Sequence, residues 1–170
     1  MDIEIIDDFL PQDELDEVKN LVMSDRFPYY IQNAVACETE QKNSWNWYAT
    51  HTFYVDDFPR SEFCHEICDR FIPRFSNYKS LVRAKVNFYP WTEILKEHSP
   101  HVDETFDHTA AIFSLNTCDG FTRIYDGSRG GFKRVDSVEN RIVFFTGSSS
   151  HNSSTTTNAQ NRYNLSFNYL

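Results

Sequence analysis

The stretch Ser99-Pro100-His101-Val102-Asp103-Glu104 holds the only His-x-Asp sequence of the chain. His101 and Asp103 are two residues apart, so both side chains leave the same face if the backbone is extended. A histidine nitrogen and a carboxylate oxygen placed in this way can bind one divalent metal ion from one side. A third ligand must come from elsewhere, and His151, far downstream, can supply a second imidazole.

Two histidines and one carboxylate on one face are the ligand set of non-haem Fe(II) oxygenases, which keep other coordination positions open for a substrate and O2. The surrounding sequence favours such a site. His101 and Asp103 fall between predicted strands, and His151 follows an apolar strand predicted at 141–145. Arg162, on the last predicted strand, could bind the far carboxylate of a keto acid whose other end chelates the metal.

Each of these residues also has an ordinary structural interpretation. His101 and Asp103 could form a hydrogen-bonded pair on the surface, and Arg162 could be an arginine on a strand face. His151 lies within the Ser/Thr-rich stretch 147–158, which has the composition of a flexible linker. The linker interpretation predicts disorder there, whereas the metal-site interpretation predicts that the first half of this stretch is held in place.

The composition is that of one globular domain. The fifteen Phe, nine Tyr and three Trp, with few glycines, favour packed sheets over a helical bundle in a chain of 170 residues. The net charge of −9 argues against a broad nucleic-acid surface, because phosphate binding needs clustered Lys and Arg. No apolar run reaches transmembrane length, the N-terminus is acidic where a signal peptide is basic, and no Cys-x-x-Cys pair occurs. These features predict a soluble, cytoplasmic protein with reduced cysteines.

Hydrophobic periodicity predicts a mostly β protein with helices in its first half. The helices are expected from Pro11 to about residue 24 and from Pro59 to about residue 73. Alternating or apolar segments predict strands at 3–9, 47–55, 81–89, 94–97, 109–115, 121–125, 132–135, 141–145 and 161–169. The polar residues 31–46, which include Trp45, predict a loop long enough to be a lid on the substrate side. Helices followed by many short strands favour a double-stranded β-helix, or jelly roll, with the N-terminal helices packed outside it.

Several segments of the second half resemble the motifs of one enzyme family. In chain order they are Asn87-Phe88-Tyr89-Pro90, His101-Val102-Asp103, Ile112-Phe113-Ser114-Leu115-Asn116, Asp119-Gly120-Phe121-Thr122-Arg123-Ile124-Tyr125, Arg141-Ile142-Val143-Phe144-Phe145, and Asn161-Arg162-Tyr163-Asn164-Leu165-Ser166-Phe167. In these segments and their order, the chain resembles the 2-oxoglutarate- and Fe(II)-dependent dioxygenases, in particular their prolyl 4-hydroxylase-like branch. The resemblance implies a single dioxygenase domain, 1–170, with a jelly-roll catalytic core at 81–170 and a supporting part with a lid at 1–80.

The resemblance also implies a site and a reaction. It assigns Fe(II) binding to His101, Asp103 and His151, and it assigns the 5-carboxylate of the co-substrate 2-oxoglutarate to Arg162. The residues that it places around the rest of the co-substrate are Tyr89, Asn87, Ser114 and Asn164. The implied reaction uses O2 to hydroxylate a substrate carbon, and it releases succinate and CO2.

The match has departures, and other functions stay open. Ser114 stands where some relatives have a tyrosine, Trp91 stands where a glycine is common, and Asp119 replaces one glycine of a Gly-Gly pair. The implied substrate is a prolyl or other peptide, or a small molecule, with neither nucleic acid nor membrane as a partner; the oligomeric state stays open. The alternatives are a nucleic-acid demethylase-type oxygenase, a cupin-like metalloenzyme that needs no keto acid, and a catalytically inactive jelly roll used as a binding module.

Overall fold

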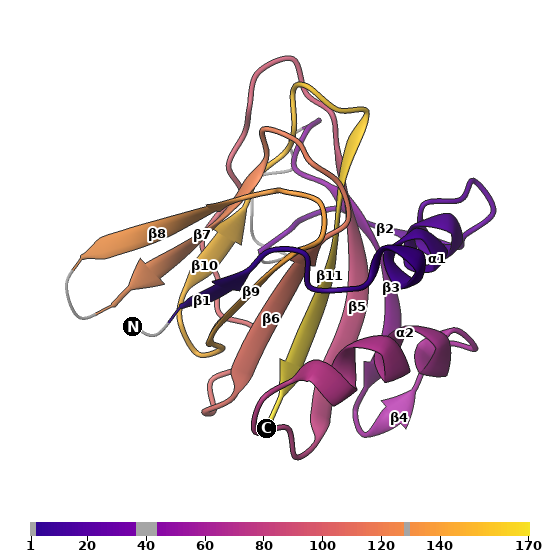
Figure 1. The fold of residues 1–170 in the computed structure, drawn as a ribbon. Coiled ribbons are helices and arrows are strands. Elements are labelled where there is room, and N and C mark those ends of the chain that lie inside the picture. The colour runs from indigo at the N-terminus through magenta and orange to yellow at the C-terminus, as the bar shows by residue number, and fades with distance from the viewer. Residues whose placement is uncertain (1–2, 37–43, 128–129) are drawn as a thin grey trace.

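The computed structural model describes residues 3–36, 44–127 and 130–170 (Figure 1). Up to residue 80 its elements are β1 (Glu4–Ile6), α1 (Gln12–Val22), β2 (Tyr30–Gln32), β3 (Tyr48–Val55), β4 (Phe58–Pro59), α2 (Cys64–Phe71) and a 3-10 turn at Ile72–Arg74. The remaining elements are β5 (Leu81–Pro90), β6 (Thr109–Ser114), β7 (Phe121–Asp126), β8 (Gly131–Asp136), β9 (Arg141–Thr146), β10 (His151–Ser153) and β11 (Asn161–Tyr169).

The strands form two antiparallel sheets. The large sheet has the order β1-β9-β6-β11-β5-β3-β2, with β4 beside β3, and the small sheet has the order β10-β7-β8. Neighbours in the large sheet come from distant parts of the chain, so β11 lies between β6 and β5. Figure 1 shows α1 and α2 on the side of the large sheet away from β7 and β8. This arrangement confirms the predicted jelly roll with helices packed outside it.

The helices bury their apolar faces against one face of the large sheet. Phe71 of α2 is fully buried, and its ring lies 5.0 Å from the ring of Phe113 on β6 and 4.9 Å from that of Phe167 on β11. Strand side chains alternate between the two faces of a sheet. Ala110 is three positions before Phe113 on β6, so its side chain points to the other face, where it packs with Ile124 of the small sheet. The main core therefore lies between helices and sheet, and the second face is left for the site.

That second face of the large sheet is polar along β5 and β11. Lys85, Asn87 and Tyr89 alternate with apolar residues on β5, and Asn164 and Ser166 do so on β11. All five line a cavity beneath the small sheet. Period-two alternation thus gives each strand one face for the core and one face for a polar interior.

The expected helix start at Pro59 is wrong. Phe58 and Pro59 form β4, which pairs with the end of β3, and α2 begins only at Cys64. The turn between the strands is made by Asp56 and Asp57, which both have a φ of 54°. Left-handed conformations at two successive residues match the twist of a tight hairpin, and aspartate tolerates them better than most residues. Local turn chemistry therefore outweighed the helix signal of the proline.

Two further expectations differ from the structure. Residues 94–97 do not form a strand, because Glu97 makes only an isolated bridge, to Ser154. The predicted loop 31–46 overlaps β2, which pairs with β3. Residues 37–43 of that loop lie outside the described residues, so the lid remains a prediction. Within the described residues, no helix is long and apolar enough to cross a membrane.

The Ser/Thr-rich stretch is ordered, so the linker interpretation is wrong. Its residues 151–153 form β10, which pairs with β7. Ser154, Thr155 and Thr156 are fully buried. The Oγ of Ser154 accepts a 2.9 Å hydrogen bond from the backbone N–H of Phe121. Small hydroxyl side chains suit this place because they satisfy buried backbone groups without filling much space.

Replacing Phe71 with alanine tests the main core. Phe71→Ala should lower the free energy of unfolding by about 3–5 kcal/mol, because it removes a fully buried ring and leaves a cavity. Phe132→Ala is the matched control, since Phe132 is 56% exposed and should change stability by less than about 1 kcal/mol. Urea denaturation measures both. Equal losses in the two variants would contradict the assigned core.

Candidate metal centre

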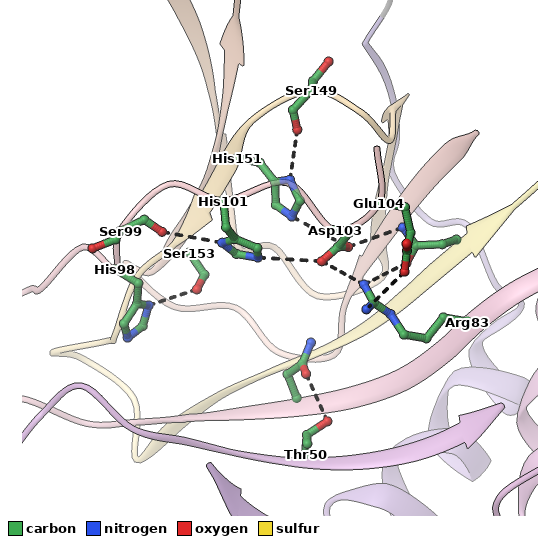
Figure 2. Close-up of polar contacts among 12 residues, drawn as sticks. Thr50, Arg83, His98, Ser99, His101, Asp103, Glu104, Ser149, His151 and Ser153 are labelled. Atoms are coloured by element: carbon green, nitrogen blue, oxygen red, sulfur yellow. Dashed lines mark hydrogen bonds and ion pairs between the residues drawn. The ribbon is translucent and has the colours of Figure 1, made fainter. Parts of the chain in front are cut away.

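His101 and His151 are brought together by backbone pairing. The N–H of His101 donates to the C=O of His151, and the N–H of His151 donates to the C=O of His101, each at 2.9 Å. This antiparallel bridge joins the loop after β5 to β10, and it places the two rings 4.6 Å apart between centroids. Asp103 follows on the same segment as His101 and turns its carboxylate toward both rings (Figure 2).

The three side chains form a compact ligand set. Nε2 of His101 lies 3.7 Å from Oδ1 of Asp103, and Nε2 of His151 lies 3.9 Å from Oδ2. One ligand atom from each residue can be chosen so that all lie within 4.8 Å of one another. Such spacing fits a single divalent ion between them, because each atom can sit about 2 Å from the same point.

A hydrogen bond at Nδ1 of each ring leaves the lone pair of Nε2 available to bind a metal ion. Nδ1 of His151 lies 3.2 Å from the C=O of Ser149, and Nδ1 of His101 lies 3.5 Å from the C=O of Ser99. When Nδ1 donates its proton to the carbonyl, Nε2 keeps its lone pair and points toward Asp103. Metal-binding histidines usually have such a partner, which sets the tautomer and the ring orientation.

The protonation states also suit a cation. Burial lowers the pKa of His151 to about 4 and also lowers the pKa of His101, so both rings are neutral at pH 7. Burial alone would raise the pKa of Asp103, but Arg83 and Lys85 outweigh it and hold that pKa well below its usual range. An ionised carboxylate beside two neutral imidazoles is the state in which these groups bind metal.

Arg83 and Asn168 hold the Asp103 carboxylate in place. A guanidinium nitrogen of Arg83 lies 2.7 Å from Oδ1, and the side-chain amide of Asn168 donates to Oδ2 at 3.3 Å. The same amide lies 2.9 Å from Nε2 of the buried His108. The orientation of Asp103 is therefore set by residues of β5 and β11 as well as by its own loop.

Arg162 is a buried cation without a counter-ion. It is 1% exposed, and its guanidinium donates to Oγ1 of Thr122 at 3.0 Å and to the C=O of Ser154 at 3.3 Å. Its Nε has no hydrogen-bond partner, and within the described part of the chain no carboxylate lies within 4.0 Å of it. A buried charge without a partner costs several kcal/mol. This end of the site therefore fits an anion.

Gly120 makes room for Arg162. A Cβ at this position would lie 2.6 Å from Cδ of Arg162 and 2.9 Å from the C=O of Thr155. The guanidinium also packs 5.3 Å from the centre of the Tyr89 ring. Packing therefore explains the glycine at position 120, because only glycine lets the Arg162 side chain cross the backbone at this point.

The cavity brings together most of the residues predicted from the sequence. Among them are the three candidate metal ligands, and Asn87, Tyr89 and Asn164 of the predicted co-substrate contacts. Two predicted contacts do not line this cavity: Ser114, which is buried opposite Asn164 in the sheet register, and Arg162, which is buried behind the lining residues Thr122 and Tyr89. The remaining lining residues are Lys85, Ile112, Thr122, Asn152, Ser153 and Ser166.

Sequence reasoning missed Arg83 and Lys85. A signal for them was present, since both share the alternating face of β5 that carries Asn87 and Tyr89. Period-two alternation places all four side chains on one side of the strand. Sequence alone could not show that this face lies against Asp103, because that contact depends on the path of the loop between β5 and β6.

Comparison with known proteins shows which solved structures share this fold. No family model and no curated protein matches this sequence. A Burkholderia pseudomallei oxidoreductase of the 2OG-Fe(II) oxygenase family superposes with a TM-score of 0.71 at 14% identity, over 98% of this chain and 84% of that one. This chain has the fold of the 2-oxoglutarate- and Fe(II)-dependent oxygenases.

Other structures of this fold align equally widely. A Pseudomonas putida prolyl-4-hydroxylase gives a TM-score of 0.67 at 14% identity, covering 98% of this chain and 91% of that one. HygX from Streptomyces hygroscopicus, with nickel and 2-oxoglutarate bound, gives 0.65 at 9% identity, covering 98% and 82%. At these identities the likeness shows the fold alone, and the chemistry must be argued from the site.

The metal-free protein should lose stability as pH falls from about 6.5 to 4. His151 has a pKa of about 4 when folded against an ordinary 6.5, so the unfolded chain takes up its proton first and becomes favoured. The loss from this residue should be on the order of 2–3 kcal/mol. Urea denaturation at pH 7 and pH 4.5 measures the loss for the wild type and for His151→Gln.

His151→Gln should lose less stability across this pH interval than the wild type. His65→Gln is the control, because the His65 side chain is 83% exposed and its removal should leave the pH dependence unchanged. The same pH dependence in His151→Gln and the wild type would contradict a buried, neutral His151.

Proposed function

We propose that this protein is a non-haem Fe(II)- and 2-oxoglutarate-dependent dioxygenase that hydroxylates a peptidyl or small-molecule substrate. The observation that carries the proposal is a metal-ligand set in a polar cavity with a buried cation next to that cavity. His101, Asp103 and His151 line the cavity. The guanidinium of Arg162 is buried behind the lining residues Thr122 and Tyr89, and no carboxylate of the described residues neutralises it. A dicarboxylate that chelates a metal through one end suits both.

The ligand set fits Fe(II). His101, Asp103 and His151 would hold the ion as two neutral imidazoles and one carboxylate, and this set leaves positions open for the co-substrate and O2. When bound, Fe(II) and 2-oxoglutarate supply the oxidising chemistry, in which O2 is consumed, succinate and CO2 are released and a substrate C–H becomes C–OH. The protein supplies the ligands, their protonation states and a site beneath the small sheet.

Arg162 and Tyr89 fit the co-substrate's 5-carboxylate. A guanidinium binds a carboxylate through two parallel hydrogen bonds, and at Arg162 such a pair would offset a buried charge. Burial raises the pKa of Tyr89, so its hydroxyl stays protonated and can donate. Asn87 and Asn164 are hydrogen-bonded to each other at 2.9 Å beside this point. Ser114 remains a predicted contact that the cavity lining does not support.

The substrate side is proposed to involve the tryptophans. Trp45, Trp47 and Trp91 line a separate surface groove next to Pro90. His98 connects the groove to the cavity, because its ring lies 5.9 Å from that of Trp45 and 5.4 Å from that of Tyr89. Such an aromatic surface suits a peptide or small organic substrate, and the net charge of −9 disfavours nucleic acid.

Ligand binding without oxygen tests the metal site directly. Anaerobic Fe(II) with 2-oxoglutarate should give the wild type a weak visible charge-transfer band, and His101→Ala should abolish it. His65→Ala is the control and should keep the band, because His65 is exposed on α2. A wild type that binds neither Fe(II) nor 2-oxoglutarate would end the enzyme proposal.

The role of Arg162 is tested with two keto acids. Arg162→Met should weaken 2-oxoglutarate binding by about 10- to 100-fold, the worth of a charge-assisted hydrogen bond. It should leave the binding of 2-oxobutyrate unchanged, since that acid has no distal carboxylate. Titration of the visible band measures both affinities, and circular dichroism checks the fold. Equal loss for both acids would contradict the assigned contact.

A further inference from the structure

Lys85 is a cation that lines the cavity, and the proposed function does not use it. It lies on β5 and lines the same cavity as His101, Asp103 and His151. Among the described residues, no carboxylate lies within 4.0 Å of its ammonium group. Its Nζ lies 5.8 Å from the centre of the Tyr48 ring. The side chain is half-buried, so water does not fully replace a partner.

The nearest acidic group is already engaged. Oδ1 of Asp103 lies 2.7 Å from Arg83, which also lies 4.0 Å from Glu104 (Figure 2). Burial and the neighbouring Arg83 lower the pKa of Lys85 to about 8, while Asp103 opposes this shift. Lys85 therefore remains mostly charged at pH 7 in a place where its surroundings disfavour the charge.

Lys85 and Arg162 lie at different levels of the sheet, and only Lys85 lines the cavity. Arg162 is opposite Tyr89 in the register of β11 and β5, whereas Lys85 is opposite Ser166. Four residues of extended strand separate these levels by about 13 Å. Lys85 is nearer the candidate metal ligands, because it lies two residues along β5 from Arg83, which contacts Asp103, and it lines the same cavity as all three ligands.

The charges around the site leave room for one more anion. The cations are Arg83, Lys85, Arg162 and a divalent metal ion. Asp103, Glu104 and a doubly charged co-substrate offset all but one of their positive charges. In a partly desolvated site an unbalanced positive charge favours an anionic ligand. The protein as a whole is acidic, so this local excess is a feature of the site itself.

We propose that Lys85 is an anion subsite beside the metal centre, and that it binds a carboxylate of the primary substrate. This assignment rests on the proposed function. It narrows the substrate to a carboxylic acid, as a small molecule or as an acidic side chain, whose carboxylate lies near the carbon that is hydroxylated. The ammonium group both selects the acid and orients it toward the metal, because a charge-assisted hydrogen bond fixes position as well as charge.

The experiment compares acids with their matched amides. Anaerobic protein loaded with Fe(II) and 2-oxoglutarate is titrated with acid and amide pairs that differ in one carboxylate. The pairs are the N-acetyl carboxamides of aspartate and asparagine, the N-acetyl carboxamides of glutamate and glutamine, and N-acetylalanine with N-acetylalaninamide. The perturbation of the visible band reports binding, and succinate release reports turnover. In the wild type at least one acid should bind about tenfold or more tightly than its amide.

Lys85→Met should remove this preference, and Lys85→Arg should retain most of it. Neither variant should change the affinity for 2-oxoglutarate more than about threefold, whereas Arg162→Met should weaken it strongly. Circular dichroism and Fe(II) binding confirm that each variant is folded. This difference between the two cations separates a substrate contact from a co-substrate contact.

Three results would overturn the assignment, and they are distinguishable. If no acid in the wild type is preferred over its amide, Lys85 does not select the substrate. If Lys85→Met weakens 2-oxoglutarate binding as much as Arg162→Met does, Lys85 serves the co-substrate instead. If the wild type with Fe(II) and 2-oxoglutarate forms no visible band, the proposed function is wrong, and the carboxylic-acid substrate inferred from it is wrong as well.

Discussion

The reciprocal pair of backbone hydrogen bonds between His101 and His151 is the constraint on which the site depends. Each residue donates to the other at 2.9 Å. Further bonds extend the pairing, because the N–H of His98 donates to the C=O of Ser153 and the N–H of Thr155 donates to the C=O of Lys96. A loop and a Ser/Thr-rich stretch are thereby joined along their length. These backbone hydrogen bonds place the two imidazole rings next to each other.

The two faces of the large sheet lie in different environments, an apolar core on one side and the polar cavity on the other. One face carries Phe113 and Phe167 against Phe71 of α2, and the other carries Lys85, Asn87 and Tyr89. Alternation along each strand makes this separation possible, since neighbouring side chains point to opposite faces. The apolar face stabilises the fold, so the polar face is free to hold groups that cost stability. Buried, unbalanced cations can persist there because the core on the other side compensates for them.

The polar face has a charge pattern of its own within an acidic protein. Among the described residues, no carboxylate lies within 4.0 Å of Arg162 or Lys85, and Arg83 contacts Asp103, a candidate metal ligand. Such groups are poor for stability but well placed for anionic ligands, because binding would supply the charge that the fold omits. The site therefore combines candidate metal ligands with cations that could bind anions, in the cavity or next to it. Both come from β5, β11 and the segments that border them.

The sequence by itself determined the local features: the strands and their alternating faces, the His101 and Asp103 pair, and the motif order that predicted the jelly roll. These depend on residues close together in the chain, whose pattern has a fixed period. Only the tertiary structure decided that 147–158 is ordered, that Arg83 and Lys85 face Asp103, and that no carboxylate of the described residues neutralises Arg162. The physical reason is that these properties arise from contacts between segments about twenty to fifty positions apart, and local composition does not determine which segments pair.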